Sequence, residues 1–227
     1  MSTLRKVTPN PEEEVAMTFA AIEDALRRIR RGEMVLVTDD EERENEGDLT
    51  MAAGWVSPEA VNFMLRWARG LVCMPCDPSR LDELEIGPMV APERATCDTA
   101  FAVSIDHRSV GSGISAQDRA VTIRRVIDPA TSAADFHRPG HVFPLRARPG
   151  GVLERRGHTE AAVDLARLAG LPPVAVICEV LHDDGSPARR PYLELFAQEH
   201  RVTMISVEQV VTYREQLEDP APAPLLL

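Results

Sequence analysis

The chain has 227 residues, of which 44% are apolar and 27% charged, and this balance excludes an intrinsically disordered protein. Its net charge of −11 argues against non-specific binding to nucleic acid or to anionic membranes. No run reaches the roughly 20 apolar residues of a membrane span and the N-terminus has no signal-peptide pattern, so we expect a single soluble domain in the cytoplasm.

In chain order, the first half predicts two helices that are separated by strands. Pro11 and the three acids after it suit a helix N-terminus, and helical apolar spacing then continues to a stop at Gly32. Ser57 followed by Pro58 marks the start of a second helix, which we expect to run to about Gly70. Short apolar runs predict buried strands over 34–37, 49–53, 71–76 and 99–106, with at most a short helix over 79–86.

The second half of the chain also predicts both helices and strands. Ser115 with Asp118 resembles a capping box for a helix to about Val126, and Thr159 is expected to cap a helix closed by Gly170. Strands are predicted over 141–147, 174–181 and 202–206, with one helix before the last strand and another, capped by Ser206 with Gln209, after it. The Pro-rich tail, 216–227, is expected to be disordered. Strands and helices mix without strict alternation, which favours one layered α/β domain.

Four cysteines are present, namely Cys73, Cys76, Cys97 and Cys178. The first two form a CxxC pair, which can indicate zinc or redox chemistry. This pair lies inside the apolar run "LVCMPC", and no second Cys/His pair follows at zinc-finger spacing. We therefore predict reduced, mostly structural thiols.

The segment "EERENEGD", residues 41–48, crowds carboxylates into a loop between two predicted strands. It can be a solvated, charged surface turn. Alternatively, its oxygens can gather around a hard cation, since Mg²⁺ usually takes one or two carboxylates and shares the oxygens of its substrate. A lone cluster of carboxylates is more often a solvated face, but Arg43, Asn45 and Gly47 interrupt the acids and add donors, acceptors and a flexible joint, which adds weight to the second interpretation and leaves both open.

A second candidate is "RRGHTEAA", residues 155–162. It can be only a basic turn that leads into an ordinary helix. If it is functional, the N–H groups near Gly157, His158 and Thr159 would form a phosphate site at a helix N-terminus, with Arg155 adding positive charge. His158 could then turn its imidazole toward a cation shared with the acidic loop.

Two further residues suit acid/base chemistry. His141 in "PGHVFPL" lies beside apolar residues, where a lone histidine is more often structural than catalytic. Glu179 in "VICEVL" is an acid within a strongly apolar strand, which is costly to bury unless it is paired or functional. If the strand ends near Glu179, the side chain is simply exposed. The turn at 112–115 is either another anion-binding site or only a good helix cap.

Five segments, in this order, resemble the 3,4-dihydroxy-2-butanone 4-phosphate synthase family of riboflavin biosynthesis: "DDEERENEGDL", "GISAQDRAVTI", "RPGHVFPLRA", "GGVLERRGHTEAAVDLARLAGL" and "VICEVLHDDGSPAR". The resemblance implies an α+β fold, a single-domain layered α/β/α sandwich with a mixed sheet over residues 1–215. It also implies conversion of D-ribulose 5-phosphate to L-3,4-dihydroxy-2-butanone 4-phosphate and formate. Mg²⁺ is the implied cofactor, with Mn²⁺ as a substitute ion, and the implied assembly is a homodimer with active sites at its interface.

The resemblance also implies a role for individual residues. Glu44 and His158 would bind the metal directly, with Glu46 supporting the site through water. His141 and Glu179 would be essential for catalysis. The implied substrate-binding residues are Arg43, Glu44, Asp48, Arg155, Gly157, His158, Thr159 and Glu179, of which Arg155 and Thr159 would bind the phosphate and Asp48 the sugar hydroxyls.

Several positions depart from the pattern of the family. Gly111 and Ser112 stand where many members have two threonines, and residues 91–98 lack the usual Asn/Thr-rich stretch. Pro187 replaces a frequent Met, and Trp67 replaces a His or Tyr. These departures lie around one side of the expected pocket, and none removes an expected metal or acid/base residue.

Three functions therefore stay open: the synthase reaction, a diverged enzyme acting on a related pentose or tetrose phosphate, and a non-catalytic paralogue that binds a sugar phosphate or a protein. Formate release from ribulose 5-phosphate with Mg²⁺ distinguishes the first from the others. Many bacterial members carry a C-terminal GTP cyclohydrolase II domain, and the residues after about 215 are too few for one.

Overall fold

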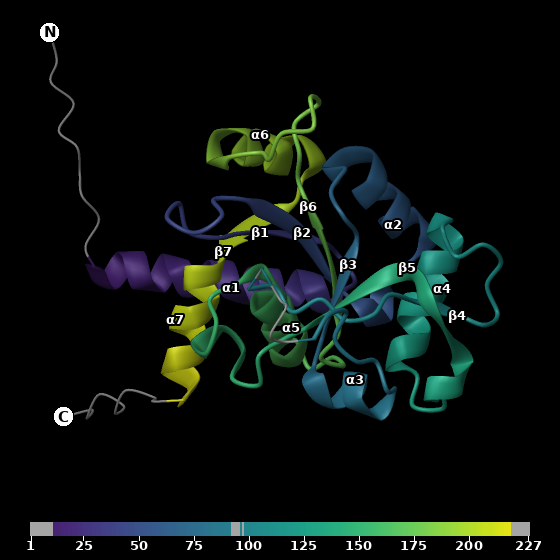
Figure 1. Cartoon of the computed structure of the whole chain (residues 1–227). Coiled ribbons are helices and arrows are strands. Elements are labelled where there is room, and N and C mark those ends of the chain that lie inside the picture. The colour runs from purple at the N-terminus through teal and green to yellow at the C-terminus, as the bar shows by residue number, and fades with distance from the viewer. Residues whose placement is uncertain (1–10, 92–95, 97, 219–227) are drawn as a thin grey trace, which may run out of the picture.

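The computed structural model describes residues 11–91, 96 and 98–218, with side chains from residue 21 onward. Within these residues one mixed sheet of seven strands, in the order β4-β5-β3-β6-β2-β1-β7, crosses the centre of the molecule (Figure 1). Strands β1/β7 and β3/β5 pair in parallel, and the other neighbours are antiparallel. The strands are β1 Val35–Thr38, β2 Gly47–Ala52, β3 Cys73–Cys76, β4 Ile105–His107, β5 Phe136–Arg146, β6 Ala175–Glu179 and β7 Thr203–Ser206.

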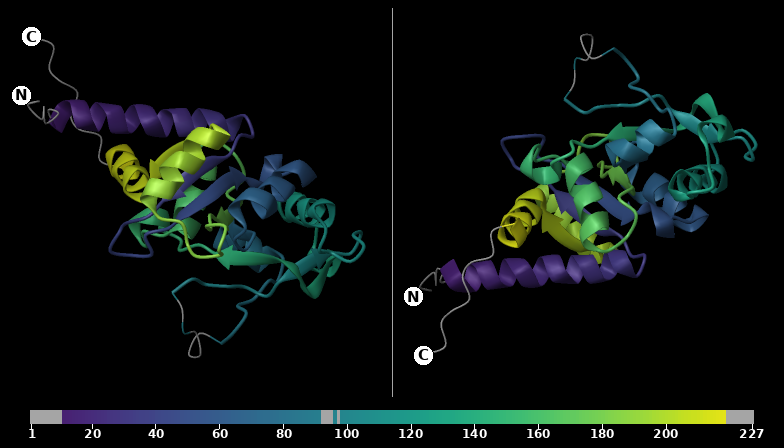
Figure 2. Two further views of the ribbon diagram at one scale, coloured as in Figure 1. Left: turned by 90° about the horizontal axis from the view of Figure 1, so that it is seen from above. Right: turned by 90° about the horizontal axis from the view of Figure 1, so that it is seen from below.

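Helices cover both faces of the sheet. Helices α2 and α6 lie on one face, and α5 and α7 lie on the other (Figure 1). Helix α1 packs lengthwise along one side of the body, against α5, α7 and β7 (Figure 2). The α-helices are α1 Pro11–Arg30, α2 Pro58–Phe63, α3 Pro78–Glu83, α4 Ala116–Ile127, α5 His158–Leu168, α6 Arg190–His200 and α7 Val207–Glu218.

The strand sequences explain the two-sided packing. In β1, Leu36 enters the core beneath α2 and α6, whereas Val35 and Val37 enter the core beneath α1, α5 and α7. Successive side chains of a strand point to opposite faces, so a strand that is covered on both sides is apolar throughout. The predicted α+β sandwich with a mixed sheet is confirmed.

Several predicted helix caps and one predicted helix stop are also confirmed. Ser57 accepts a hydrogen bond from the N–H of Ala60 (3.2 Å), and Ser115 accepts one from the N–H of Asp118 (3.0 Å). Ser206 and Gln209 form a reciprocal pair at the start of α7, with distances of 3.1 Å and 2.8 Å. After α1, Gly32 adopts a φ of 83°, a left-handed conformation that favours glycine.

Other boundaries differ from the predictions. The strand expected over 99–106 is wrong for most of its length, because only Ile105–His107 form β4 while Phe101 and Ala102 make isolated bridges. The helix expected from Ser57 to Gly70 ends as α at Phe63 and continues as one π-helical turn, Met64–Ala68.

At the C-terminus, α7 reaches Glu218, three residues into the tail that was expected to be disordered, and 219–227 lie outside the described residues. Of the helices in the described part of the chain, none combines the length and apolarity needed to cross a bilayer.

Candidate functional site

The pairing of β2 with β6 creates the candidate site. Strand β2 begins at Gly47, inside the acidic motif, so Asp48 lies in the sheet directly opposite Glu179 at the end of β6. A pocket of about 150 Å³ opens here. Its lining includes most of the predicted site residues: Arg43, Glu44, Glu46, Asp48, Arg155, His158, Thr159 and Glu179.

The acidic loop between β1 and β2 is organised by a carboxylate that the sequence interpretation missed. Asp39 has a fully buried side chain and accepts hydrogen bonds from the N–H groups of Glu44 (3.1 Å) and Glu46 (2.8 Å). It also pairs with Arg43 at 2.8 Å. This carboxylate therefore shapes the loop and places Glu44 and Glu46 at the pocket, whereas Glu41 and Glu42 are exposed and do not line it.

Glu44 and His158 lie side by side as a candidate metal pair. Glu44 Oε2 is 3.6 Å from His158 Nδ1, and an oxygen of Asp39 lies within 4.8 Å of ligand atoms of both. The imidazole is 7% exposed, and its Nε2 has no hydrogen-bond partner within the described residues. A buried nitrogen without a partner fits a site that is completed by a ligand.

The charges at this pair are strongly coupled. The close contact with His158, together with the positive charge of Arg43, lowers the pKa of Glu44 to about 2 despite partial burial. Burial alone would lower the pKa of His158, but the carboxylates of Asp48, Glu44 and Asp39 raise it to about 9. Without a metal the imidazole is therefore a cation at neutral pH, and a divalent ion would take the place of its proton.

Asp48 is the most deeply buried acid of the pocket. Burial, together with the nearby Glu179, Glu44 and Glu46 carboxylates, raises its pKa to about 7, although His158 opposes the shift. Its Oδ1 atom has no hydrogen-bond partner within the described residues. A carboxyl group with a free oxygen and this pKa can accept a hydrogen bond from a ligand hydroxyl or share a proton with it.

The N-terminus of α5 provides the cationic end of the pocket. The helix begins at His158 with Gly157 as its N-cap, so the prediction that Thr159 caps it is wrong. Thr159 is instead the second helical residue, and no side chain caps this helix start. The N–H groups of the first turn are thus available to an anion.

Arg155 lies across this helix start and is fixed there. Its guanidinium donates to the buried Glu160 at 2.6 Å and to Thr99 at 3.4 Å. A Cβ atom on Gly157 would lie only 2.3 Å from Arg155 Nη1, so the glycine is needed for this close approach. Arg155 and the helix N-terminus together suit a phosphate group.

Glu179 ends β6 and is partly exposed, so the interpretation in which the strand stops at this acid is the correct one. Its Oε2 accepts a hydrogen bond from the N–H of Leu71 at 2.8 Å. Gly70 permits this contact, because a Cβ at Gly70 would lie 2.5 Å from that oxygen. The carboxylate is therefore held at the pocket wall.

His141 is not brought to this pocket. It lies on β5 four residues before Leu145, which does line the pocket, and this spacing corresponds to about 13 Å along a strand. His141 instead pairs with Asp106 of β4, with Nδ1 2.6 Å from Oδ2, and its side chain is 42% exposed. Gly113 packs directly against this pair. The 112–115 turn therefore belongs to the His141 region.

The cysteine predictions are confirmed for three positions. Cys73, Cys76 and Cys178 are free and buried, and burial raises the pKa of each thiol. Cys97 lies outside the described residues. Cys73 lines the pocket as an apolar wall.

The sequence interpretation missed Asp39, Asp106 and Glu160. Each contacts a predicted site residue, and none of the three lines the pocket. Asp39 directly follows a buried strand and Asp106 lies within one, which was a signal in the sequence, whereas Glu160 lies in the first turn of α5.

The family model described as 3,4-dihydroxy-2-butanone 4-phosphate synthase matches residues 23–213. The riboflavin biosynthesis protein RibBA of Aquifex aeolicus is 53% identical over 203 residues, covering 88% of this chain and 50% of that protein. RibBA of Bacillus cereus strain AH187 is 50% identical over 200 residues with the same coverage. The chain thus spans about half the length of the curated relatives it matches.

Solved structures give the same result. RibBX, a two-domain 3,4-dihydroxy-2-butanone 4-phosphate synthase from A. baumannii, matches with a TM-score of 0.84 and 44% identity, over 87% of this chain and 59% of that one. A 3,4-dihydroxy-2-butanone 4-phosphate synthase in complex with two magnesium ions matches with a TM-score of 0.83 and 40% identity, over 88% and 99% of the two chains. The fold, the site residues and these similarities identify the chain as a member of the 3,4-dihydroxy-2-butanone 4-phosphate synthase family.

Proposed function

We propose that this chain converts D-ribulose 5-phosphate to L-3,4-dihydroxy-2-butanone 4-phosphate and formate in riboflavin biosynthesis. The atoms of the substrate equal those of the two products, so the reaction needs no co-substrate and no redox partner. The observation that carries the proposal is the Glu44–His158 pair at 3.6 Å, which stands beside a cationic helix N-terminus in one pocket. Such a pocket suits a small phosphorylated polyol.

Glu44 and His158 would hold the cation. The ionised carboxylate of Glu44 and the imidazole nitrogen that faces it, His158 Nδ1 at 3.6 Å, suit a divalent ion between them, and a related structure is described as a complex with two magnesium ions. Bound Mg²⁺, or Mn²⁺ as a substitute, would act as a Lewis acid toward adjacent oxygens of the sugar. Glu46, at the pocket rim, would support the site through water.

The remaining pocket residues would fix the sugar. Arg155 and the first N–H groups of α5 would bind the phosphate, with the hydroxyl of Thr159 beside them. Asp48 would accept hydrogen bonds from the hydroxyl groups, and Arg43 would lie at the open side. Holding both ends of the sugar restricts its carbon skeleton to one course of rearrangement.

Proton transfer would be shared between Glu179 and His141. The first deprotonation beside the ketone suits Glu179, because its carboxylate is held at the pocket wall. In one chain His141 is too far along β5 to take part, yet its imidazole is exposed and oriented by Asp106. We therefore propose a homodimer in which the partner subunit's His141 completes each pocket.

The test is formate release from D-ribulose 5-phosphate with Mg²⁺, with EDTA as the control. We expect turnover that EDTA abolishes and excess Mg²⁺ restores. Turnover of another sugar phosphate without formate would favour the diverged enzyme, and binding of sugar phosphate without any turnover would favour the non-catalytic paralogue. The cytoplasmic location stays a prediction from the sequence.

A further inference from the structure

Arg189 contacts the acidic loop from a distant part of the chain. Its guanidinium Nη1 donates to the main-chain carbonyl of Glu44 and to that of Asn45, the latter at 2.5 Å. The same atom lies 3.9 Å from the Glu46 carboxylate. One cationic side chain therefore bridges three consecutive loop residues, including the one that would bind the metal.

Arg189 is itself held firmly by the backbone around it. It follows a short hairpin in which Ala188 donates to the carbonyl of Val180 at 3.0 Å. Its own carbonyl accepts from Leu193 at 3.0 Å as α6 begins. Val180 in turn donates to the carbonyl of Gly47 at 2.8 Å, which fixes this hairpin against the start of β2.

The hairpin also explains one departure from the family pattern. Leu181 and Pro187 face each other as an isolated bridge, and the flanking hydrogen bonds run from His182 to the carbonyl of Ser186 and from Ala188 to that of Val180. Neither bond uses the nitrogen of Pro187, which has no hydrogen to donate. Proline is therefore compatible with this position, and Arg189 keeps its place.

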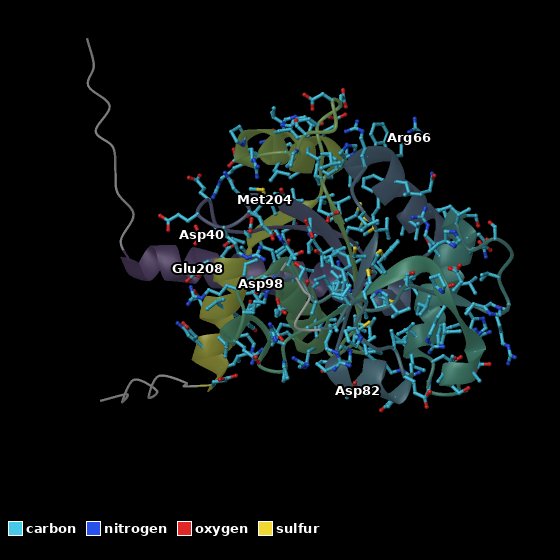
Figure 3. All side chains as sticks on the ribbon, viewed as in Figure 1. Asp40, Arg66, Asp82, Asp98, Met204 and Glu208 are labelled. Atoms are coloured by element: carbon cyan, nitrogen blue, oxygen red, sulfur yellow. The ribbon has the colours of Figure 1, made fainter. Side chains whose placement is uncertain are left out.

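The far side of the acidic loop borders a second cavity. A cavity of about 620 Å³ lies there, and its lining includes Asp40 and Glu208, which are labelled in Figure 3, together with Asn45 and Glu46. Asn45 adopts a left-handed φ of 54°. Asp39 and Arg189 both bind main-chain groups of this loop, so polar contacts contribute to its position.

We propose that Arg189 is a positioning residue that sets the place of Glu44 relative to His158, and thereby the affinity of the metal site. The part that concerns the metal rests on the proposed function. Mg²⁺ accepts oxygen ligands only near 2.0–2.1 Å, so a small displacement of the Glu44 backbone removes a ligand. The guanidinium also offsets the repulsion between the Glu44 and Glu46 carboxylates.

The experiment compares Arg189→Gln, Arg189→Lys and the matched control Arg190→Gln with the unmodified chain. Among the described residues Arg190 pairs with the exposed Glu194 and not with the loop, so its loss leaves the loop contacts in place. Two quantities are measured without substrate: amide hydrogen exchange of residues 40–46, and the dissociation constant for Mn²⁺ by electron paramagnetic resonance.

For Arg189→Gln we expect the loop amides to exchange about tenfold faster and Mn²⁺ to bind about 10- to 100-fold more weakly. Arg189→Lys should recover part of both effects, and Arg190→Gln should change neither. Exchange in β3 and α4 should stay as in the unmodified chain. Unchanged loop exchange in Arg189→Gln, or faster exchange throughout the chain, would overturn the positioning role.

These readouts separate the inference from the proposed function. If the unmodified chain releases no formate, the proposed function fails, while loop exchange still decides the role of Arg189. If formate is released and Arg189→Gln leaves both loop exchange and Mn²⁺ affinity unchanged, the inference alone fails.

Discussion

Two imidazole–carboxylate pairs in this molecule are built for different tasks. His158 is 7% exposed, lies among the carboxylates of Glu44, Asp48 and Asp39, and keeps a buried nitrogen without a hydrogen-bond partner in the described residues. His141 is 42% exposed and makes one short contact of 2.6 Å with Asp106.

The difference in burial and contacts determines which chemistry each imidazole can perform. A buried ring with an unpartnered nitrogen and several anions around it suits a bound cation. An exposed ring that one carboxylate orients through Nδ1 leaves Nε2 free to move a proton. The second pair can act on the substrate only if another subunit brings a pocket to it, which is the reason for proposing a homodimer.

The largest effect on the rate is expected at His141, for which the comparison of the two histidines predicts a role in proton transfer and none in metal binding. His141→Ala should reduce the rate of formate release by about 10²–10⁴-fold, the usual contribution of a general acid or base, and leave Mn²⁺ affinity unchanged. Rate assays and metal titration on the same preparation check this. A parallel loss of metal affinity would show that the two regions are not separate.

The same variant tests the proposed interface. When His141→Ala is mixed with Glu44→Gln and the subunits exchange, half of the dimers carry both variants, and each of these has one intact pocket. We therefore expect activity to return to about a quarter of the unmodified level. No recovery in a mixture with demonstrated subunit exchange would place both residues in the pocket of one chain.

The second prediction concerns the buried pair. Glu44→Gln keeps the shape of the side chain but removes the ionised oxygen, so formate release should fall by about a hundredfold or more because metal-assisted catalysis supplies several kcal/mol. Unlike His141→Ala, Glu44→Gln should also weaken the binding of Mn²⁺. Normal metal binding in this variant would contradict the assignment of Glu44 as a ligand.

These contrasts also separate what the sequence could predict from what it could not. The strands at Val35–Thr38 and Ala175–Glu179 and the cap at Ser115 depend on neighbouring residues, so local pattern was sufficient for them. The helix start at Gly157 was misplaced, because Thr and Gly are about equally good N-caps and the approach of Arg155 that requires a glycine is not visible locally.

In the candidate site, too, local features could be predicted from the sequence and contacts between remote segments could not. Residues close together in the motif "EERENEGD" could be grouped from the sequence. A cation shared with His158 was one of the interpretations that the residues left open, and the family resemblance favoured it and added Glu179. The distance of His141 from the pocket depends on β5 pairing with β3 and β4, which are contacts between remote segments. The role of Asp39 depends on how the loop folds back on it, which no spacing rule encodes.

The third prediction concerns the pH dependence of metal binding, which tests the protonation of His158. The pKa of His158 is raised to about 9 in the metal-free protein, so metal binding must release its proton. Mn²⁺ affinity should therefore rise about tenfold per pH unit between roughly pH 6.5 and 9, and then level off. Titrations at several pH values check this, and a flat profile would contradict a protonated His158.

Stability should show the opposite trend, because the raised pKa means that the folded state holds the proton more tightly than the unfolded state does. The stabilisation from His158 is complete below pH 6.5 and is lost as pH rises through 9. The Tm of the EDTA-treated protein should fall across this range, and added Mg²⁺ should raise Tm more at pH 8.5 than at pH 6.5. An equal shift at both values would mean that metal and proton do not compete.

The smallest effect is expected at the phosphate end of the pocket, at the N-cap of α5. In Gly157→Ala the new Cβ would lie 2.3 Å from Arg155 Nη1, and the far end of this flexible side chain can move aside. Arg155 would lose its close approach to the helix N-terminus, so we expect KM for the sugar phosphate to rise about tenfold with little change in kcat, the pattern for lost uniform binding. Steady-state kinetics at saturating Mg²⁺ measure this. A fall in kcat with KM unchanged would instead indicate that Arg155 acts in the transition state, and the phosphate end would then be part of the chemistry rather than an anchor for it.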